Sequence, residues 1–265
     1  MTALALRVER QHQPPYGVLQ APPHLAPHLG RETRQNRLLQ LLPDEIRARL
    51  APHLELVTLA SGTVLCEPAM PIKNVYFPVD AIASLVHVME NGASAQTAMI
   101  GSDGLVGVSL LMSGSTPPCR TVVHSAGQAF KLKAAILAAE FDRAGALTQL
   151  MLRYTQSLIT QMAQTAVCNR HHSLEQQLCR WLLMSLDRLP GDDLLMTQEL
   201  ISNLLGVRRE GVTEAAGKLQ RLGMIRYSRG RITVTDRPQL EEHACECYGV
   251  VKRETDRLLC SRWMC

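Results

Sequence analysis

The stretch TQELISNLLGVRREGVTEAAGKLQRLGMIRYSRGRITV, residues 197–234, decides the fold of the C-terminal third of the chain. Its apolar residues predict two amphipathic helices separated by a turn at Gly206, a residue suited to the positive φ that ends a helix. Thr197 is the expected N-cap of the first helix. Because so short a turn cannot bring the helices antiparallel, they are expected to cross steeply, as in a helix–turn–helix.

The residues after the second helix predict a small hairpin. Apolar and polar side chains alternate over 225–227 and again over 232–234, with a Gly-containing turn between them. Arg229 and Arg231 would then stand at the tip of a two-stranded wing, where they can bind a phosphate backbone. A single exposed arginine is usually just solvated, but the two preceding helices favour a winged helix–turn–helix.

Positive charge is concentrated in the same segment. Residues 197–237 hold eight Arg and Lys against four Asp and Glu, a surplus that equals the net charge of +4 of the whole chain. Such a local basic patch suits a polyanion. Charge alone would be equally compatible with a solvated basic face.

The second helix has a polar face opposite its apolar stripe, since successive residues are ~100° apart. Arg and Thr can bind phosphates or base edges, and Glu can accept a hydrogen bond from a cytosine amino group. Because a helical glycine costs about 1 kcal/mol relative to Ala, Gly217 suggests a close approach of the backbone to a ligand. The predicted DNA-binding residues are Thr197, Arg208, Arg209, Glu210, Thr213, Glu214, Gly217, Arg221, Arg229 and Arg231.

The N-terminal half has a different texture. Residues 1–33 are rich in Pro, His and Gln and predict a disordered arm. Residues 34–133 begin with short amphipathic helices and continue as short β-branched runs, with an Asn91-Gly92 turn between two alternating segments. Closely spaced strands without intervening helices predict a small antiparallel barrel or roll.

Residues 134–171 predict one long helix with an apolar stripe. The stripe could pack on its own domain, or pair with a second copy of the chain as a two-stranded coiled coil, which is the favoured interpretation. Residues 172–237 then form the winged domain, and 238–265 a helical tail. The predicted dimerisation residues are Leu147, Met151, Tyr154, Leu158 and Met162.

Length and composition set the broad class. A chain of 265 residues is long enough for two domains with real cores. No apolar run reaches the ~20 residues that cross a bilayer, and the first residues do not resemble a secretory signal, so no membrane partner and a cytoplasmic protein are expected. The eight scattered cysteines are expected to be reduced thiols.

From about residue 36 to 237 the chain resembles the Crp/Fnr family of bacterial transcription regulators. Arg209, Glu210 and Val212 fall on the Arg-Glu-x-Val core of that family's recognition helix. The resemblance implies an α+β fold: an N-terminal antiparallel β-roll like the cyclic-nucleotide-binding domain, a long dimerisation helix, and a C-terminal winged helix–turn–helix. It implies a sequence-specific regulator that binds double-stranded DNA as a homodimer, contacts RNA polymerase, and responds to a signal at the roll.

Two positions depart from the family pattern. Arg208 stands where the family often has Ser or Thr, and Glu214 stands where an Arg is common. The operator sequence is therefore expected to differ from those of better-known members.

The resemblance also suggests where an effector would bind. Family members that bind a cyclic nucleotide use a Gly-Glu pair for the ribose and an Arg-Ser/Thr pair for the phosphate. Here Gly107 is followed by Val108 instead of Glu, while Arg120 and Thr121 match the second pair. No cofactor is predicted and a cyclic nucleotide is disfavoured, but Gly107, Arg120 and Thr121 remain the candidate effector residues.

Other functions find less support in the sequence. Cys245-x-Cys247 lacks a second well-spaced pair, and His171-His172 is most simply a surface or interdomain pair, so no metal ligand is predicted. No nucleophile–base constellation or phosphate-binding Gly loop is present, so no enzyme is predicted. The alternative function is a ligand-binding signalling module whose basic domain contacts protein or RNA.

Overall fold

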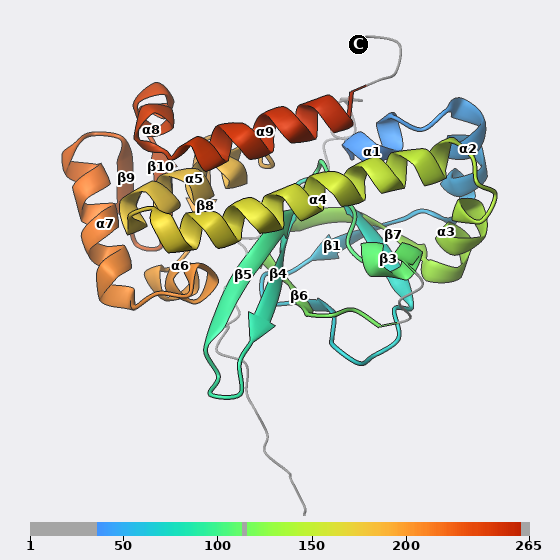
Figure 1. Ribbon diagram of the computed structural model, residues 1–265, viewed down its shortest axis with the longest axis horizontal. Helices are drawn as coiled ribbons and strands as arrows, with labels where there is room; N and C mark the ends of the chain where they lie inside the picture. The colour runs from blue at the N-terminus through green and yellow to red at the C-terminus, as the bar shows by residue number, and fades with distance from the viewer. Residues whose placement is uncertain (1–35, 113–115, 261–265) are drawn as a thin grey trace, which may run out of the picture.

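The computed structural model describes residues 36–112 and 116–260; the predicted N-terminal arm lies outside these residues (Figure 1). Two antiparallel sheets form the N-terminal roll, with strand orders β1-β7-β3 and β2-β6-β4-β5. Gly92 has a φ of +84° in the turn that joins β4 to β5, which confirms the predicted hairpin. The strands are β1 (Glu55–Leu59), β2 (Val64–Cys66), β3 (Asn74–Pro78), β4 (Ile82–Val88), β5 (Ser94–Ile100), β6 (Arg120–Ser125) and β7 (Gly127–Lys133).

Short helices precede and follow the strands of the roll in the sequence, and one 3-10 helix lies between β5 and β6. Asn36 caps the first of them and also donates two hydrogen bonds, to the Pro78 and Gly104 carbonyls at 3.0 and 2.7 Å, which fixes the chain entry on the roll. The elements are α1 (Arg37–Gln40), α2 (Asp44–Leu50), the 3-10 helices η1 (Ala51–His53) and η2 (Val108–Met112), and α3 (Ala134–Phe141).

The predicted single helix over 134–171 is instead two helices, α3 and α4 (Ala146–His171). The break occurs where Ala144 adopts a positive φ of 54° and Gly145 adopts an extended conformation as the N-cap of α4. A helix cannot continue through such a backbone, so the sequence prediction of continuity was wrong.

The predicted dimerisation stripe is instead part of the core of the protomer. Leu147, Met151, Tyr154 and Leu158 are at most 5% exposed, and Met162 packs partly buried against the same cluster. The Tyr154 hydroxyl donates to the Leu105 carbonyl at 3.1 Å. These residues pack against buried side chains of the roll, across which α4 runs (Figure 1).

The opposite face of α4 carries a second apolar stripe. Leu152, Ile159 and Val167 are 57%, 53% and 48% exposed, and the small side chains of Ala163 and Ala166 are also exposed between them. Leu152 and Ile159 are seven residues apart, so they lie on the same side of the helix. The protomer therefore leaves apolar side chains of α4 uncovered.

The C-terminal domain begins with α5, which is capped by Ser173 through a capping box with Gln176. Its wing is a three-stranded antiparallel sheet, β8-β10-β9, where the sequence predicted only two strands. The predicted helical tail forms α8 and α9, and α9 runs beside α4 (Figure 1). The elements are α5 (Leu174–Leu186), β8 (Asp193–Leu195), α6 (Gln198–Leu205), α7 (Arg209–Arg221), β9 (Ile225–Ser228), β10 (Arg231–Val234), α8 (Arg237–His243) and α9 (Glu246–Leu258).

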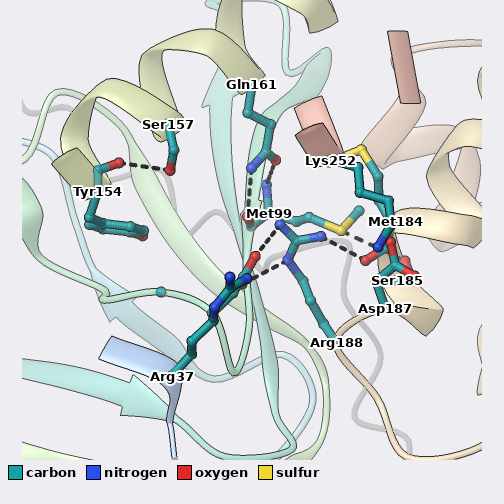
Figure 2. A network of polar contacts seen from close by, with 12 residues as sticks. Arg37, Met99, Tyr154, Ser157, Gln161, Met184, Ser185, Asp187, Arg188 and Lys252 are labelled. Carbon is teal, nitrogen blue, oxygen red and sulfur yellow. Dashed lines mark hydrogen bonds and ion pairs between the residues drawn. The ribbon is translucent and has the colours of Figure 1, made fainter. Parts of the chain in front are cut away.

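The roll and the C-terminal domain share one hydrophobic core. Ile82, Val86, Met99 and Val122 of the roll belong to the same buried cluster as the apolar faces of α5, α6 and α7. Gln161 of α4 bonds the Met99 backbone on both sides, accepting from its N–H at 2.7 Å and donating to its carbonyl at 3.2 Å (Figure 2). Buried side chains in mutual contact therefore connect the roll to the helix–turn–helix.

Polar contacts reinforce this junction. Arg188, just after α5, is 7% exposed and forms a bidentate pair with Asp103 of the roll, at 3.0 and 2.7 Å. Figure 2 shows its guanidinium also reaching the Met184 carbonyl, at 2.8 Å. A Cβ added at Gly101 would lie 2.6 Å from the Arg188 side chain, so a glycine is needed for this approach.

Across the described residues, no helix is long and apolar enough to cross a membrane.

Candidate DNA interface

The helix–turn–helix forms as the local signals predict. The Thr197 hydroxyl oxygen accepts from the Leu200 N–H at 3.1 Å as the N-cap of α6, and Gly206 ends that helix with a φ of +68°. The apolar side of α7 is fully packed against the domain core by Val212, Ala215, Ala216 and Leu219. The polar side of α7 is thereby turned outward.

The outward face of α7 carries most of the predicted DNA-binding residues. Arg208, which occupies the N-cap position without a side-chain cap, begins this face. The Thr213 hydroxyl lies 2.7 Å from Gln198 Oε1 and 3.1 Å from the Arg209 carbonyl, so it joins α6 to the start of α7. The exposed side chains are Arg208, Arg209, Glu210, Thr213, Glu214 and Arg221.

The two glycines of α7 serve different purposes. A Cβ added at Gly211 would lie 2.9 Å from Leu174 Cδ2, so packing of α7 on α5 requires a glycine there. A Cβ at Gly217 would meet only the Arg221 guanidinium, at an ordinary 3.6 Å. The protomer itself therefore does not require Gly217, and its role in letting a ligand approach the backbone stays a prediction.

The wing places its arginines at the tip. Arg229 and Gly230 both have positive φ, 48° and 76°, in the turn between β9 and β10. The Tyr227 hydroxyl donates to the Met196 carbonyl at 3.0 Å and holds the wing against the segment that leads into α6. Arg231 lies 3.5 Å from Asp193 of β8, so it is partly neutralised, whereas Arg229 is exposed in the turn.

The structure divides the basic patch into paired and unpaired cations. Lys218 bonds Glu175 at 2.6 Å, Arg231 contacts Asp193, and Arg237 bonds Asp187 and Glu241. The other five have no ion pair within the described residues and are therefore available to phosphates. They are Arg208, Arg209, Arg221, Arg226 and Arg229; Arg226 was not among the predicted site residues, although its alternation with buried Ile225 marks it as exposed.

The three candidate effector residues differ in their surroundings. Arg120 is held by the Glu67 carboxylate, with its Nε donating to the two oxygens at 2.9 and 3.1 Å. Its neighbour Thr121 is 2% exposed in β6, between β2 and β4. Gly107 has a φ of +99° before η2 and packs near Val75, while Val108 is buried. The Glu67 carboxylate thus already neutralises the positive charge of Arg120 that an anionic ligand would need.

Most of the described cysteines are reduced thiols, as expected, and one is not. Six are free and buried, but Cys260 is disulfide-bonded; the remaining cysteine, Cys265, lies outside the described residues. Cys245 and Cys247 were predicted to bind no metal because the sequence offers no second well-spaced pair. The fold instead brings them against Cys168 and His172 at the end of α4.

A buried polar chain also crosses the junction between the domains. Trp181 Nε1 of α5 donates to Gln96 Oε1 at 2.8 Å, and Gln96 Nε2 donates to Ser84 Oγ at 2.8 Å. Ser84 Oγ in turn contacts His124 Nδ1, and the imidazole is only 2% exposed. Burial, aided by the charge of Arg188, lowers the pKa of His124 from its ordinary 6.5 to about 3.

Acidification is expected to weaken the folded state through His124. The unfolded chain binds this proton below pH 6.5 but the folded protein only near pH 3, so stability is complete above 6.5 and falls by about 1.4 kcal/mol per pH unit below it. Between pH 7.5 and 5.0 the loss attributable to this residue is about 2 kcal/mol. Urea unfolding at both pH values should show it, and His124→Gln should remove that part of the change. An equal pH dependence in both proteins would contradict the assignment.

Comparison with known proteins gives the domain and the fold. Residues 176–243 match the family of Crp-like helix-turn-helix domains. The chain is similar to a putative Crp/Fnr-family transcriptional regulator from Eubacterium rectale, with a TM-score of 0.61, 17% identity, and coverage of 78% of this chain and 96% of that one. No curated protein sequence matches this chain.

Two further solved structures show the same architecture. FixK2 from Bradyrhizobium japonicum has a TM-score of 0.61 at 14% identity, and the match covers 72% of this chain and 98% of FixK2. The c-di-GMP-responsive global regulator CLP from Xanthomonas campestris has a TM-score of 0.55 at 15% identity, with coverage of 72% and 99%. These likenesses establish that the roll, α4 and the winged domain are arranged in the Crp/Fnr fold.

Proposed function

We propose that this chain, a DNA-binding regulator of the Crp/Fnr type, acts as a homodimer that binds a two-fold symmetric operator in double-stranded DNA. The observation that carries the proposal is the outward face of α7 beside a wing with unpaired arginines. A helix of this kind fits the major groove, and the wing then lies along the neighbouring phosphates.

The side chains of this face divide by chemistry. Arg209, Glu210, Thr213 and Glu214 are placed to contact base edges, where the two carboxylates can select a cytosine amino group. Phosphate contacts fall to Arg208, Arg221, Arg226 and Arg229, with Arg231 beside them and Gly217 admitting the DNA backbone. Thr197 supports the site by capping α6.

The dimer is proposed to form through the exposed stripe of α4, defined by Leu152, Ile159, Ala163, Ala166 and Val167. Two copies paired along this stripe would bury apolar surface that one protomer leaves in water. The recognition helices would then read successive major grooves about one turn apart, ~34 Å. The dimerisation residues predicted from the sequence cannot form this interface, because they are buried against the roll of their own protomer.

The roll is proposed to receive an unidentified signal that alters the position of α6 and α7. The shared core between β4–β6 and α5 supports this route, since the Trp181–Gln96 bond joins the two domains directly. RNA polymerase is the proposed protein partner and the cytoplasm the proposed location, as for a regulator that acts on bacterial DNA. We assign the protein no catalytic activity.

Two arginine substitutions test the DNA-binding role. Arg209→Ala should cost about 1–3 kcal/mol on the operator and relax its sequence preference, because Arg209 is placed at base edges. Arg229→Ala should weaken binding to all sequences alike and reduce the salt slope by about 1, because it contacts phosphate. Genome-wide footprinting supplies the operator, and fluorescence anisotropy over a range of salt concentrations measures both effects.

Arg253→Ala provides the control, since it removes an exposed arginine of α9 away from the proposed interface. It should bind the operator like the unmodified protein. Equal affinity for the operator, random DNA and RNA would overturn the proposal, and a preference for RNA would favour the alternative of a signalling module.

A further inference from the structure

Four potential metal ligands meet where the end of α4 touches the start of α9. Cys168 lies on the last turn of α4 and His172 is the C-cap four residues later, while Cys245 and Cys247 lie at the N-terminus of α9. Their ligand atoms all lie within 4.8 Å of one another. We propose that these four side chains bind one zinc ion.

The spacing of the ligand atoms fits a single tetrahedral ion. Cys168 Sγ and Cys245 Sγ are 3.5 Å apart, and Cys247 Sγ lies 3.6 Å from His172 Nδ1. Zn–S bonds of about 2.3 Å and a Zn–N bond of about 2.0 Å give tetrahedral edges of roughly 3.8 Å between thiolates and roughly 3.5 Å between thiolate and imidazole. A [4Fe–4S] cluster would hold each ligand on a different iron, and a [2Fe–2S] cluster would divide the four ligands between two irons, so both would spread the ligand atoms beyond the 4.8 Å that encloses them here.

The histidine is already oriented as a ligand. His172 Nε2 lies 3.2 Å from the Glu246 carboxylate, which leaves Nδ1 facing the thiols. Metal-bound imidazoles are typically fixed in this way, by a carboxylate on the nitrogen that does not bind the metal. Glu246 stands between the two cysteines of α9, so the same short segment supplies two ligands and the residue that orients a third.

The site is closed to solvent. The three cysteines are at most 4% exposed and the His172 side chain 14%. Three thiolates and a neutral imidazole around Zn²⁺ leave one net negative charge, and buried Arg180, whose charge acts on Cys168 and Cys247, can offset it. Four protein ligands with no open position are typical of structural zinc, not catalytic zinc.

A disulfide explains the arrangement less well. The Cys168–Cys245 separation is a non-bonded contact, far longer than an S–S bond of about 2.05 Å. Such a bond would also not explain why Cys247 and His172 lie beside these thiols, or why Glu246 orients the imidazole. The zinc ion uses all four ligands.

The position of the site indicates what the metal would do. α4 ends at His171, His172 follows as its C-cap, and Ser173 caps α5 of the DNA-binding domain. Zinc would therefore tie the end of the long helix to α9 at the point where the chain enters the winged domain. Occupancy would fix that entry, and metal loss would release α9 from α4.

Metal content of the reduced, untagged full chain tests the proposal. Elemental analysis should give about one zinc per chain for the unmodified protein and for Cys66→Ser, a control that removes a buried thiol of the roll. Cys245→Ser should lose stoichiometric zinc, while His172→Cys should retain it as a four-thiolate site. Cobalt(II) exchanged into the unmodified protein should give thiolate-to-metal charge-transfer absorption.

Glu246→Gln tests the site without removing a ligand, so a change in its zinc affinity cannot be attributed to a variant that fails to fold. It should remain folded and bind zinc about 10–100-fold more weakly in competition with a chromophoric chelator. Absence of zinc from the folded, reduced protein after dialysis against excess Zn²⁺ would overturn the proposal. So would zinc binding that is unchanged in Cys245→Ser, or cobalt spectra without thiolate bands.

Discussion

Ile159→Glu is expected to convert the protein to a monomer and to reduce its operator affinity at least ~100-fold. The side chain is 53% exposed at the centre of the α4 stripe, so the substitution should leave the protomer folded. In the proposed dimer it would place two carboxylates together in an apolar seam, which costs both burial and like-charge repulsion. Each half-site would then be bound alone, without the gain from linking two recognition helices.

Light scattering and fluorescence anisotropy on the same samples measure both effects. Val88→Glu provides the matched control, since Val88 is 50% exposed on β4 and lies outside the α4 stripe. It should leave the mass and the affinity unchanged. A dimeric Ile159→Glu protein would show that α4 does not pair through this stripe, and a monomer with full operator affinity would show that DNA binding does not need the dimer.

The stripe also shows what the sequence could not determine. The apolar period of α4 correctly indicated a buried face, but Leu147 and Leu152 point to opposite sides of the helix, and both sides are apolar. An apolar period indicates that one face of a helix is buried, but it does not tell whether the roll or a second chain buries that face. Only the three-dimensional position of the roll assigns Leu147 to the core and Leu152 to the surface.

The helix–turn–helix was predictable because its determinants are local. The cap at Thr197, the left-handed turn at Gly206 and the apolar face of α7 each depend on residues a few positions apart. β8 is only three residues long and is stabilised by pairing with β10, so it left no pattern to detect. The ligand pairs Cys168–His172 and Cys245–Cys247 carry a usable spacing, but 77 residues separate Cys168 from Cys245. Their meeting is a product of the fold.

Asp103→Ala is expected to lower the free energy of unfolding by about 3–5 kcal/mol, because it leaves a buried guanidinium without its counter-ion. Arg188 is 7% exposed and donates to Asp103 at 3.0 and 2.7 Å, while its remaining hydrogen bond, to the Met184 carbonyl, carries no compensating charge. Urea unfolding at neutral pH measures the loss. Glu254→Ala, which removes the partner of exposed Arg257, should cost much less, because the ion pair that it breaks lies at the surface.

The double variant Asp103→Ala/Arg188→Met separates the cost of an orphaned charge from the value of the pair. Methionine can fill the space of the arginine stem, so most of the stability should return. If the double variant were as unstable as Asp103→Ala, the pair itself would hold the roll on α5. Since Asp103 belongs to the roll and Arg188 to the winged domain, hydrogen exchange in Asp103→Ala should then rise on both sides of the junction, in β5 as well as α5.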